Sequence, residues 1–161
     1  MGFDSHSELA FNISISQLRS QKEDLRNLRN QSGMAATLSG LISTVFASMA
    51  DFSSLLTKGT YFFLFLPVDF WFVVVCFCIA LSFAALAAVD VEYCTFDLDA
   101  NWILGNAADA KGISATYETL TKECEGYFQK NESVINNARF RLNMSILFSA
   151  LLVPSWLCVL I

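Results

Sequence analysis

Three long apolar stretches dominate the hydrophobic pattern of this chain. They run from about Gly33 to Leu56, from Tyr61 to Val89 and from Leu142 to Ile161. Asp51 is the one charged residue of the first stretch, Asp69 is that of the second, and the third has none. The hydrocarbon core of a bilayer is ~30 Å thick, and a helix crosses it with roughly 20 apolar residues. The pattern therefore predicts an all-α integral membrane protein with three transmembrane helices.

Residues 1–32 show a different pattern, that of an amphipathic helix outside the bilayer. Leu18, Leu25 and Leu28 recur at helical spacing, whereas residues of both charge signs fill the opposite face. Such a helix either lies on the membrane surface or packs against another helix. Helices that lie on a membrane are usually more purely basic, so the mixed charges favour helix packing.

A short turn, Lys58-Gly59-Thr60, separates the first two apolar stretches. Residues 33–89 are therefore predicted to form a transmembrane helical hairpin. Pro67 and Asp69 interrupt the beginning of the second stretch. We therefore expect residues 61–66 to form a short interfacial piece, and the helix to run from about Val68 to Val89.

The first span is rich in small residues that recur about every four positions and lead toward an acidic residue. Small residues let helix backbones approach closely in lipid, and hydroxyls bond across the contact. Two interpretations remain open for this face: it packs against another helix, or it lines a water-filled path in an oligomer. Its members are Ala36, Gly40, Thr44, Ala47, Ser48 and Asp51.

Residues 90–141 are predicted to lie outside the bilayer, as a solvated acidic connector followed by a helix. In this helix the intervals between the seam positions alternate between four and three residues. This is the heptad spacing of a coiled coil and predicts an oligomer seam. Asn131 at a seam position is a candidate for fixing register or subunit number. The helix is expected to continue into the third span, 142–161, as far as about Val153, with Pro154 near its end. The seam consists of Ile113, Tyr117, Leu120, Cys124, Tyr127, Asn131, Val134 and Ala138.

The basic residues predict the orientation of the spans. Nine of the ten lie either before the first span or between the second and third, and Lys58 is the exception. The positive-inside rule then places the N-terminus and residues 90–141 in the cytoplasm and the C-terminus outside, in a membrane that we take to be the bacterial inner membrane.

Composition excludes several classes of function. The chain is 55% hydrophobic and 16% charged, with a mean hydropathy of +0.49, and its net charge of −5 leaves no basic patch for nucleic acid. Five cysteines without a C-x-x-C pair and a single histidine supply no metal-ligand spacing. No phosphate loop or nucleophile motif occurs. We therefore expect no enzyme activity, no cofactor and no bound metal.

The order of these elements resembles that of the SLATT-type membrane effectors found in bacterial conflict and phage-defence operons. The shared features are a cytoplasmic N-terminal helix, a hairpin of spans with a very short turn and a helical cytoplasmic extension. The third span departs from the two-span plan of that family. The resemblance implies pore formation or membrane perturbation, as an antiviral defence, when a partner sensor signals.

Two functions from different classes follow for this chain. In the first, it is an oligomeric membrane effector or channel whose cytoplasmic helices gate a path along the first span. In the second, it is a non-conducting scaffold that docks a cytoplasmic protein partner. Membrane lipid and further copies of the chain are the expected partners in both, because a small protein with an odd number of spans favours homo-oligomers.

Overall fold

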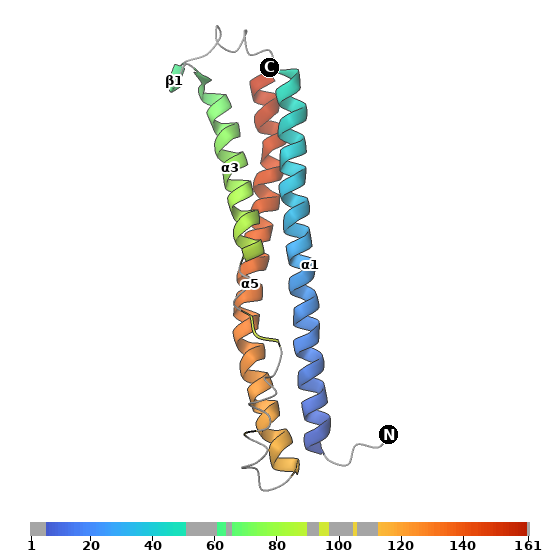
Figure 1. Cartoon of the computed structure of the whole chain (residues 1–161). Helices are drawn as coiled ribbons and strands as arrows, with labels where there is room; N and C mark the ends of the chain where they lie inside the picture. The colour runs from blue at the N-terminus through green and yellow to red at the C-terminus, as the bar shows by residue number, and fades with distance from the viewer. Residues whose placement is uncertain are drawn as a thin grey trace. The chain divides into compact units, whose positions relative to one another are not determined.

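The computed structural model describes residues 6–50, 61–63, 66–89, 94–96, 105 and 113–160. Within these residues helix α1 covers His6–Met49, α3 covers Val68–Val89 and α5 covers Ile113–Leu160, and two short strands, β1 (Tyr61–Phe63) and β2 (Leu66–Pro67), precede α3 (Figure 1). Each of these three helices is long and apolar enough to cross a membrane. The predicted fold class is confirmed to this extent.

Helix α1 joins the predicted outer helix and the first span in one helix of 44 residues. No proline occurs between His6 and Met49. Gly33 stands at the predicted junction, and glycine inside a helix costs only about 1 kcal/mol relative to alanine. A helix that is stabilised on both sides of this residue therefore has no reason to end there. The predicted turn at 58–60 and the end of the first span at Leu56 lie outside the described residues.

The second span begins where the sequence interruption predicted. Strands β1 and β2 pair antiparallel, with Tyr61 opposite Pro67 and Phe63 opposite Leu66, so the expected interfacial piece contains a small β-hairpin. Helix α3 starts at Val68, directly after Pro67, and runs to Val89. Asp69 lies in its first turn, where a carboxylate faces the positive end of the helix dipole.

Helix α5 is continuous over 48 residues, and Pro154 lies inside it. The predicted continuation into the third span is confirmed, but the helix extends beyond the expected end near Val153 to Leu160. Proline lacks an N–H group and removes one helical hydrogen bond. The residues on both sides of Pro154 are nevertheless helical, since the packing of Leu152 and Trp156 in a buried cluster supports both turns.

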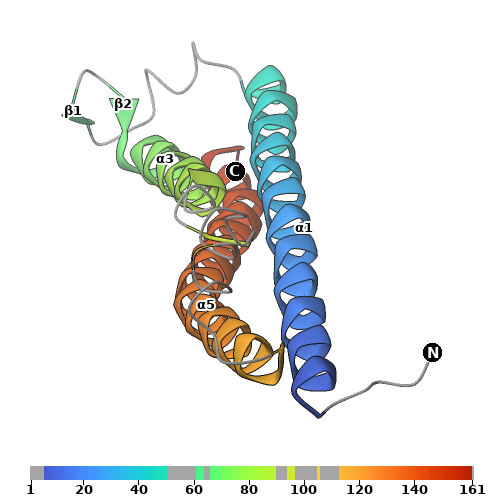
Figure 2. The same ribbon diagram turned by 60° about the horizontal axis from the view of Figure 1, so that its bottom comes forward.

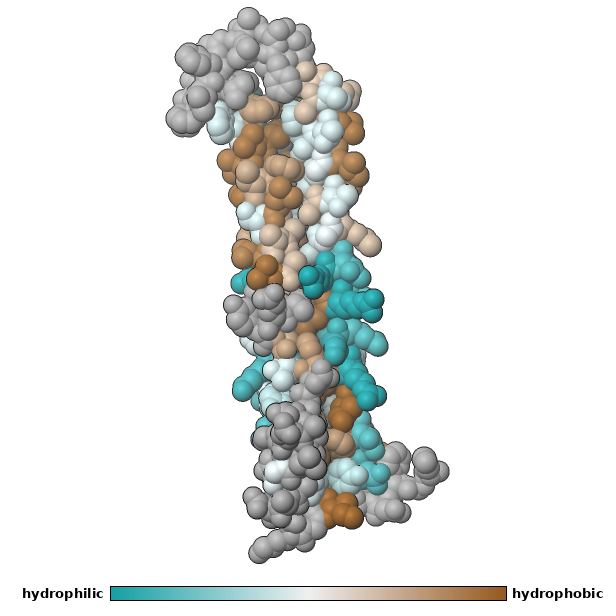
Figure 3. Space-filling view, viewed as in Figure 1, coloured by the Kyte–Doolittle hydropathy of each residue, from teal (hydrophilic) through white to brown (hydrophobic). Residues whose placement is uncertain are grey.

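The chain divides into two compact units, and α1 and α5 contribute residues to both. We call residues 1–27 and 90–137 the polar unit, and residues 28–89 and 138–161 the apolar unit. In the space-filling view, teal hydrophilic side chains gather on α1 of the polar unit, whereas brown and pale side chains cover the apolar unit (Figure 3). The sequence of the apolar unit holds six charged residues, Arg29, Asp51, Lys58, Asp69, Arg139 and Arg141.

In the polar unit, α1 and α5 run parallel. The hydroxyls of Ser7 and Ser114 are 3.1 Å apart, and the rings of Phe11 and Tyr117 have centroids 5.5 Å apart. Further along both helices, Gln21 bonds the backbone of Phe128. The residue numbers of the contacting pairs increase in the same direction along both helices, so the two helices are parallel.

In the apolar unit, α5 lies beside both α1 and α3 (Figure 1, Figure 2). The Ser39–Ser149 and Phe46–Trp156 contacts make α1 and α5 parallel. Contacts of Ser145 with Ala80 and of Trp156 with Phe70 make α3 antiparallel to α5. The direction of the chain therefore alternates from α1 to α3 to α5, as it must in a chain that crosses a membrane three times in succession. A buried cluster of Val73, Cys76, Leu152, Trp156 and Val159 joins α3 and α5, and Ile42 and Phe46 of α1 pack against it.

Candidate functional site

The predicted heptad seam of α5 lies largely against other parts of the same chain. Leu120, Cys124, Asn131 and Ala138 are buried, and Ile113 is 78% exposed. Tyr117, Tyr127 and Val134 are half-buried. Ile135, which the sequence analysis did not include, is 1% exposed. Val134 and Ile135 are adjacent apolar residues, so spacing alone did not show which one faces inward. The seam as an oligomer contact stays a prediction.

Asn131 uses its amide to hold the connector onto α5. Its Oδ1 accepts a hydrogen bond from the Thr95 backbone N–H at 3.2 Å, and its Nδ2 donates to the Thr95 carbonyl at 2.8 Å. The side chain is 1% exposed. A buried amide with both ends bonded selects one position of the partner segment. Within the chain, this amide therefore fixes where residue 95 sits on α5.

Gln21 is a second buried amide of the polar unit that the sequence analysis missed. Its Nε2 donates to the Phe128 carbonyl at 3.1 Å and to Oε2 of Glu132 at 3.2 Å. Buried positions of α1 include Ser14, Leu18, Gln21 and Leu25, which are spaced alternately by four and three. The heptad spacing could therefore have identified Gln21 from the sequence, but the polar residues Ser14 and Gln21 at seam positions made the pattern hard to recognise.

Cys124 is the buried thiol at the centre of this seam. Burial raises the pKa of the thiol, and the neighbouring Glu123 carboxylate adds to the rise. A thiol held in its neutral form is a poor nucleophile, because the thiolate is the reactive species. Its position argues for a packing role.

The predicted small-residue face of α1 is only partly covered within the chain. Ala36, Gly40 and Ala47 are half-buried, and Thr44 and Ser48 are exposed. Ala47 packs against the cluster around Trp156. Asp51 lies outside the described residues. Whether this face packs against another subunit or lines a path stays a prediction.

The inward face of α1 in the apolar unit includes other small residues beside Leu28, Ile42 and Phe46. Ser32, Ala35 and Ser39 are buried. The Ser39 and Ser149 hydroxyls lie 2.6 Å apart and link α1 to α5. Ser145 donates to the Ala80 carbonyl at 2.8 Å and links α5 to α3. Small residues and hydroxyl bonds thus contribute to the contacts among the three helices, in the way that is usual for helices in lipid.

The Ser39–Ser149 pair has more close acceptors than protons. Besides their mutual contact, Ser39 lies 2.8 Å from the Ala35 carbonyl and Ser149 lies 2.7 Å from the Ser145 carbonyl. Each hydroxyl has one proton. The pair therefore forms a directed chain in which one serine donates to the other and that one donates to its own backbone.

The outer face of α1 carries a shallow, open groove of about 660 Å³. A Cβ added at Gly33, which lines the groove, or at Gly40 would meet nothing within 4 Å among the described residues outside α1's own backbone. Thr37 and Thr44 donate to backbone carbonyls of their own helix at 2.9 and 2.8 Å. The groove is lined by Asn30, Gly33, Met34, Thr37, Leu38 and Leu41.

Among the described residues, no group of three or more His, Cys, Asp or Glu side chains is placed to hold a metal ion. Comparisons with protein-family models, with curated proteins and with solved structures found no match to this chain.

Proposed function

We propose that this chain is a subunit of a homo-oligomeric membrane effector that conducts ions along the outer face of α1. The observation that carries the proposal is the outer surface of α1 in the apolar unit. Gly33, Gly40, Thr44 and Ser48 lie there, and among the residues that the structure describes no packing contact requires the small size of the two glycines.

Glycine inside a helix is unfavourable by about 1 kcal/mol relative to alanine. Apart from the adjoining residues and backbone of α1 itself, no atom of the described residues lies within 4 Å of a Cβ added at Gly33 or Gly40, so no packing contact among them offsets this cost. In lipid, glycines and small hydroxyl residues at intervals of three or four are typical of close helix contacts. The small residues would allow a second copy of α1 to approach closely, or would leave room for water in an assembled path.

The hydroxyls of this face suit both lipid and water. Thr37, Thr44 and Ser48 each donate to a backbone carbonyl of α1, so none of their protons is left unbonded in hydrocarbon. Their oxygens still have lone pairs for water or a cation. Asp51, two positions after Met49, would add one carboxylate per subunit at the end of such a path, and rings of carboxylates favour cations.

The polar unit supplies the gating element of this proposal. Its α1 segment exposes Arg19, Glu23 and Arg26, a surface of both charge signs that fits a cytoplasmic protein partner. On the predicted orientation this unit is cytoplasmic, in a bacterial inner membrane, and a partner sensor of a defence system acts on it. The resemblance to SLATT-type effectors supports this assignment of roles.

The alternative is a non-conducting scaffold. It is favoured by the interior of the apolar unit, where the hydroxyls of Ser39, Ser145 and Ser149 bond across helices and close the contacts between them. In this alternative the α1 groove holds lipid or a second copy without forming a path, and the polar unit only anchors its partner.

Planar-bilayer recordings with the full chain, alone and with its natural partners, separate the two functions. The proposal expects cation-selective conductance in wild type, loss of cation preference in Asp51→Asn, and loss of conductance in Gly40→Leu. Ala150→Leu, which also introduces a leucine, at an exposed position of α5, is the matched control and should conduct. Absence of conductance in wild type with the partners present would overturn the channel proposal and leave the scaffold.

The orientation has its own test. In a cysteine-free background, single cysteines at Ser7, Ser114 and Thr57 are labelled with an impermeant maleimide from each side of the membrane. Positions 7 and 114 should react from the cytoplasmic side and position 57 from the opposite side. Reaction of all three from one side would contradict the predicted topology.

A further inference from the structure

Two buried polar atoms of the apolar unit have no hydrogen-bond partner among the described residues. They are the Ser43 hydroxyl oxygen on α1 and the indole Nε1 of Trp156 on α5. Trp156 is 4% exposed. Buried polar groups in proteins are almost always bonded, and hydrocarbon outside the protein offers no partner. We therefore expect both atoms to have a hydrogen-bond partner inside the apolar unit.

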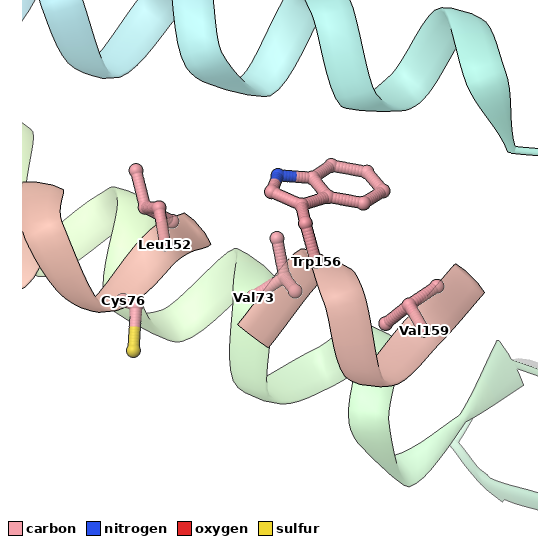
Figure 4. Packing of buried hydrophobic residues seen from close by; sticks show 5 residues of the cluster. All are labelled: Val73, Cys76, Leu152, Trp156 and Val159. Atoms are coloured by element: carbon pink, nitrogen blue, oxygen red, sulfur yellow. The ribbon is translucent and has the colours of Figure 1, made fainter. Parts of the chain in front are cut away.

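The two atoms belong to facing parts of α1 and α5. Phe46, one helical turn after Ser43, stacks on the Trp156 ring with centroids 6.3 Å apart and planes 9° from parallel. Ile42, next to Ser43, packs against the cluster that contains Trp156. In the close view, the indole lies between the α5 backbone and the α1 ribbon, with its nitrogen at the end nearer Leu152 (Figure 4).

Ser43 differs from the other hydroxyl residues of α1 in this unit. Ser32, Thr37, Thr44 and Ser48 donate to a backbone carbonyl of α1 three or four residues earlier, and the Ser39 hydroxyl lies 2.8 Å from the Ala35 carbonyl. The Ser43 hydroxyl makes no such bond, although it is buried. The carbonyl of Ser39, four residues before it, therefore keeps the lone pair that a serine at this spacing usually takes.

We propose that the apolar unit binds one ordered water between α1 and α5, held by Trp156 Nε1 and Ser43 Oγ. An indole N–H only donates, whereas a serine hydroxyl donates or accepts. The ligand must therefore accept from Trp156 and bond to a hydroxyl. Water does both, and buried waters typically make about three hydrogen bonds. The free lone pair of the Ser39 carbonyl is the third partner on the same turn of α1.

This water extends the polar contact that Ser39 and Ser149 begin. Ser39 and Ser43 are four residues apart, so they lie on the same face of α1, about 6 Å apart along its axis. The α1–α5 contact thus contains a direct hydroxyl pair followed by a water-mediated one. The site does not depend on oligomer formation or conductance, so its test is independent of the proposed function.

Solution NMR of the full chain in detergent micelles tests the site. Trp71, Trp102 and Trp156 give three indole N–H signals, and Trp156→Phe identifies the one from Trp156. We expect a cross-relaxation peak between the Trp156 Hε1 proton and water. Ser43→Val removes the hydroxyl and fills the space, so this peak should disappear and the Hε1 signal should move upfield. Ser48→Val, at an exposed position of the same helix, is the matched control and should leave both unchanged.

A crystal structure from a lipidic phase, at a resolution that shows ordered waters, distinguishes a bridging water from a direct bond. The proposal expects one density peak within hydrogen-bond distance of both Ser43 Oγ and Trp156 Nε1. A direct bond between these two atoms would overturn it even if the cross-relaxation peak is present. Absence of that peak in the wild-type chain would overturn it as well, whatever the behaviour of the variants.

Discussion

The polar and apolar units use the same helix pair, but α1 buries leucines together with Ser14 and Gln21 in the first unit and mostly small residues in the second. In the polar unit, α1 buries Leu18 and Leu25 with exposed charged residues around them. In the apolar unit, the same alternating spacing of four and three leads to Ser32, Ala35 and Ser39. The spacing is set by helix geometry, whereas the change in the type of buried residue is the one that a change of surroundings from water to lipid would favour.

The outer surfaces show the reverse distribution. In the apolar unit, α1 exposes Leu38, Leu41 and Val45 at more than half of their area. In water this arrangement would be unfavourable at ~25 cal/mol per Å² of exposed apolar surface. In lipid the outside is as apolar as leucine, so burial of leucine gives no driving force, and close packing and hydroxyl bonds hold the helices together. Exposed leucines over buried serines are therefore the expected arrangement for a membrane unit.

The comparison is not uniform along the apolar unit. Near the end of α5, the buried positions are large, namely Val73, Leu152 and Trp156. Trp156 contacts aromatic side chains of both α1 and α3, with Phe46 stacked on it and Phe70 edge-on. Small residues close the helix contacts around Ser39, and aromatic packing fills the wider space near Trp156.

The largest effect is expected from a charge inside the polar unit. Leu25 is 1% exposed, so Leu25→Asp loses the packing of a buried leucine and buries a carboxylate. The unit should lose more than about 3 kcal/mol of stability and become sensitive to protease in detergent solution. Arg26→Asp, at the adjacent exposed position, should change stability by less than about 0.5 kcal/mol. Equal sensitivity of the two variants would show that this seam is not buried in solution.

Added bulk should have the largest effect in the apolar unit. Ser149 lies 2.6 Å from Ser39 across the helix contact, so Ser149→Leu should cost about 1–3 kcal/mol through overpacking. Ser149→Ala removes only the hydroxyl bond and should cost about 0.6 kcal/mol. Denaturation in SDS, followed by tryptophan fluorescence, measures both. Ala150→Leu at the neighbouring exposed position is the control, and a cost equal to that of Ser149→Leu would contradict the small-residue contact.

A smaller effect is expected when the amide of Asn131 is removed. Asn131→Ala frees the N–H and carbonyl of Thr95. Thr95 is exposed, so water replaces the lost bonds and the cost should be only about 1 kcal/mol. Hydrogen exchange at the Thr95 amide should become faster, whereas Asn136→Ala on the exposed face should leave it unchanged. An unchanged rate in Asn131→Ala would show that the amide does not hold the connector.

The smallest effect is expected from the pH dependence of the polar unit. Because burial raises the pKa of Cys124 in the folded chain, the unfolded chain loses the thiol proton first as pH rises. The stability difference between wild type and Cys124→Ala should be constant below the ordinary thiol pKa and should narrow above it. Thermal unfolding from neutral to alkaline pH measures this difference. A difference that widens with pH would mean that the folded thiol ionises more easily than the unfolded one.

The sequence by itself determined where the helices of this protein form, although it did not predict the small β-hairpin before α3. Hydrophobic length predicted three helices of spanning size, Pro67 and Asp69 predicted the start of α3 at Val68, and the uninterrupted seam predicted that α5 continues into the third span. These features depend on local chemistry, namely apolar length, proline geometry and helical spacing. They need no knowledge of what lies opposite a residue.

Only the tertiary structure decided which face of each helix turns inward. The choice of Ser39 rather than Thr44, of Ile135 rather than Val134, and of Thr95 as the partner of Asn131 depends on the neighbouring segments. In water, hydrophobic spacing marks the buried face, although Gln21 shows that polar members hide it. In lipid both faces of a span are compatible with apolar residues, so hydrophobicity does not distinguish inside from outside, and shape and hydrogen bonding between the helices decide.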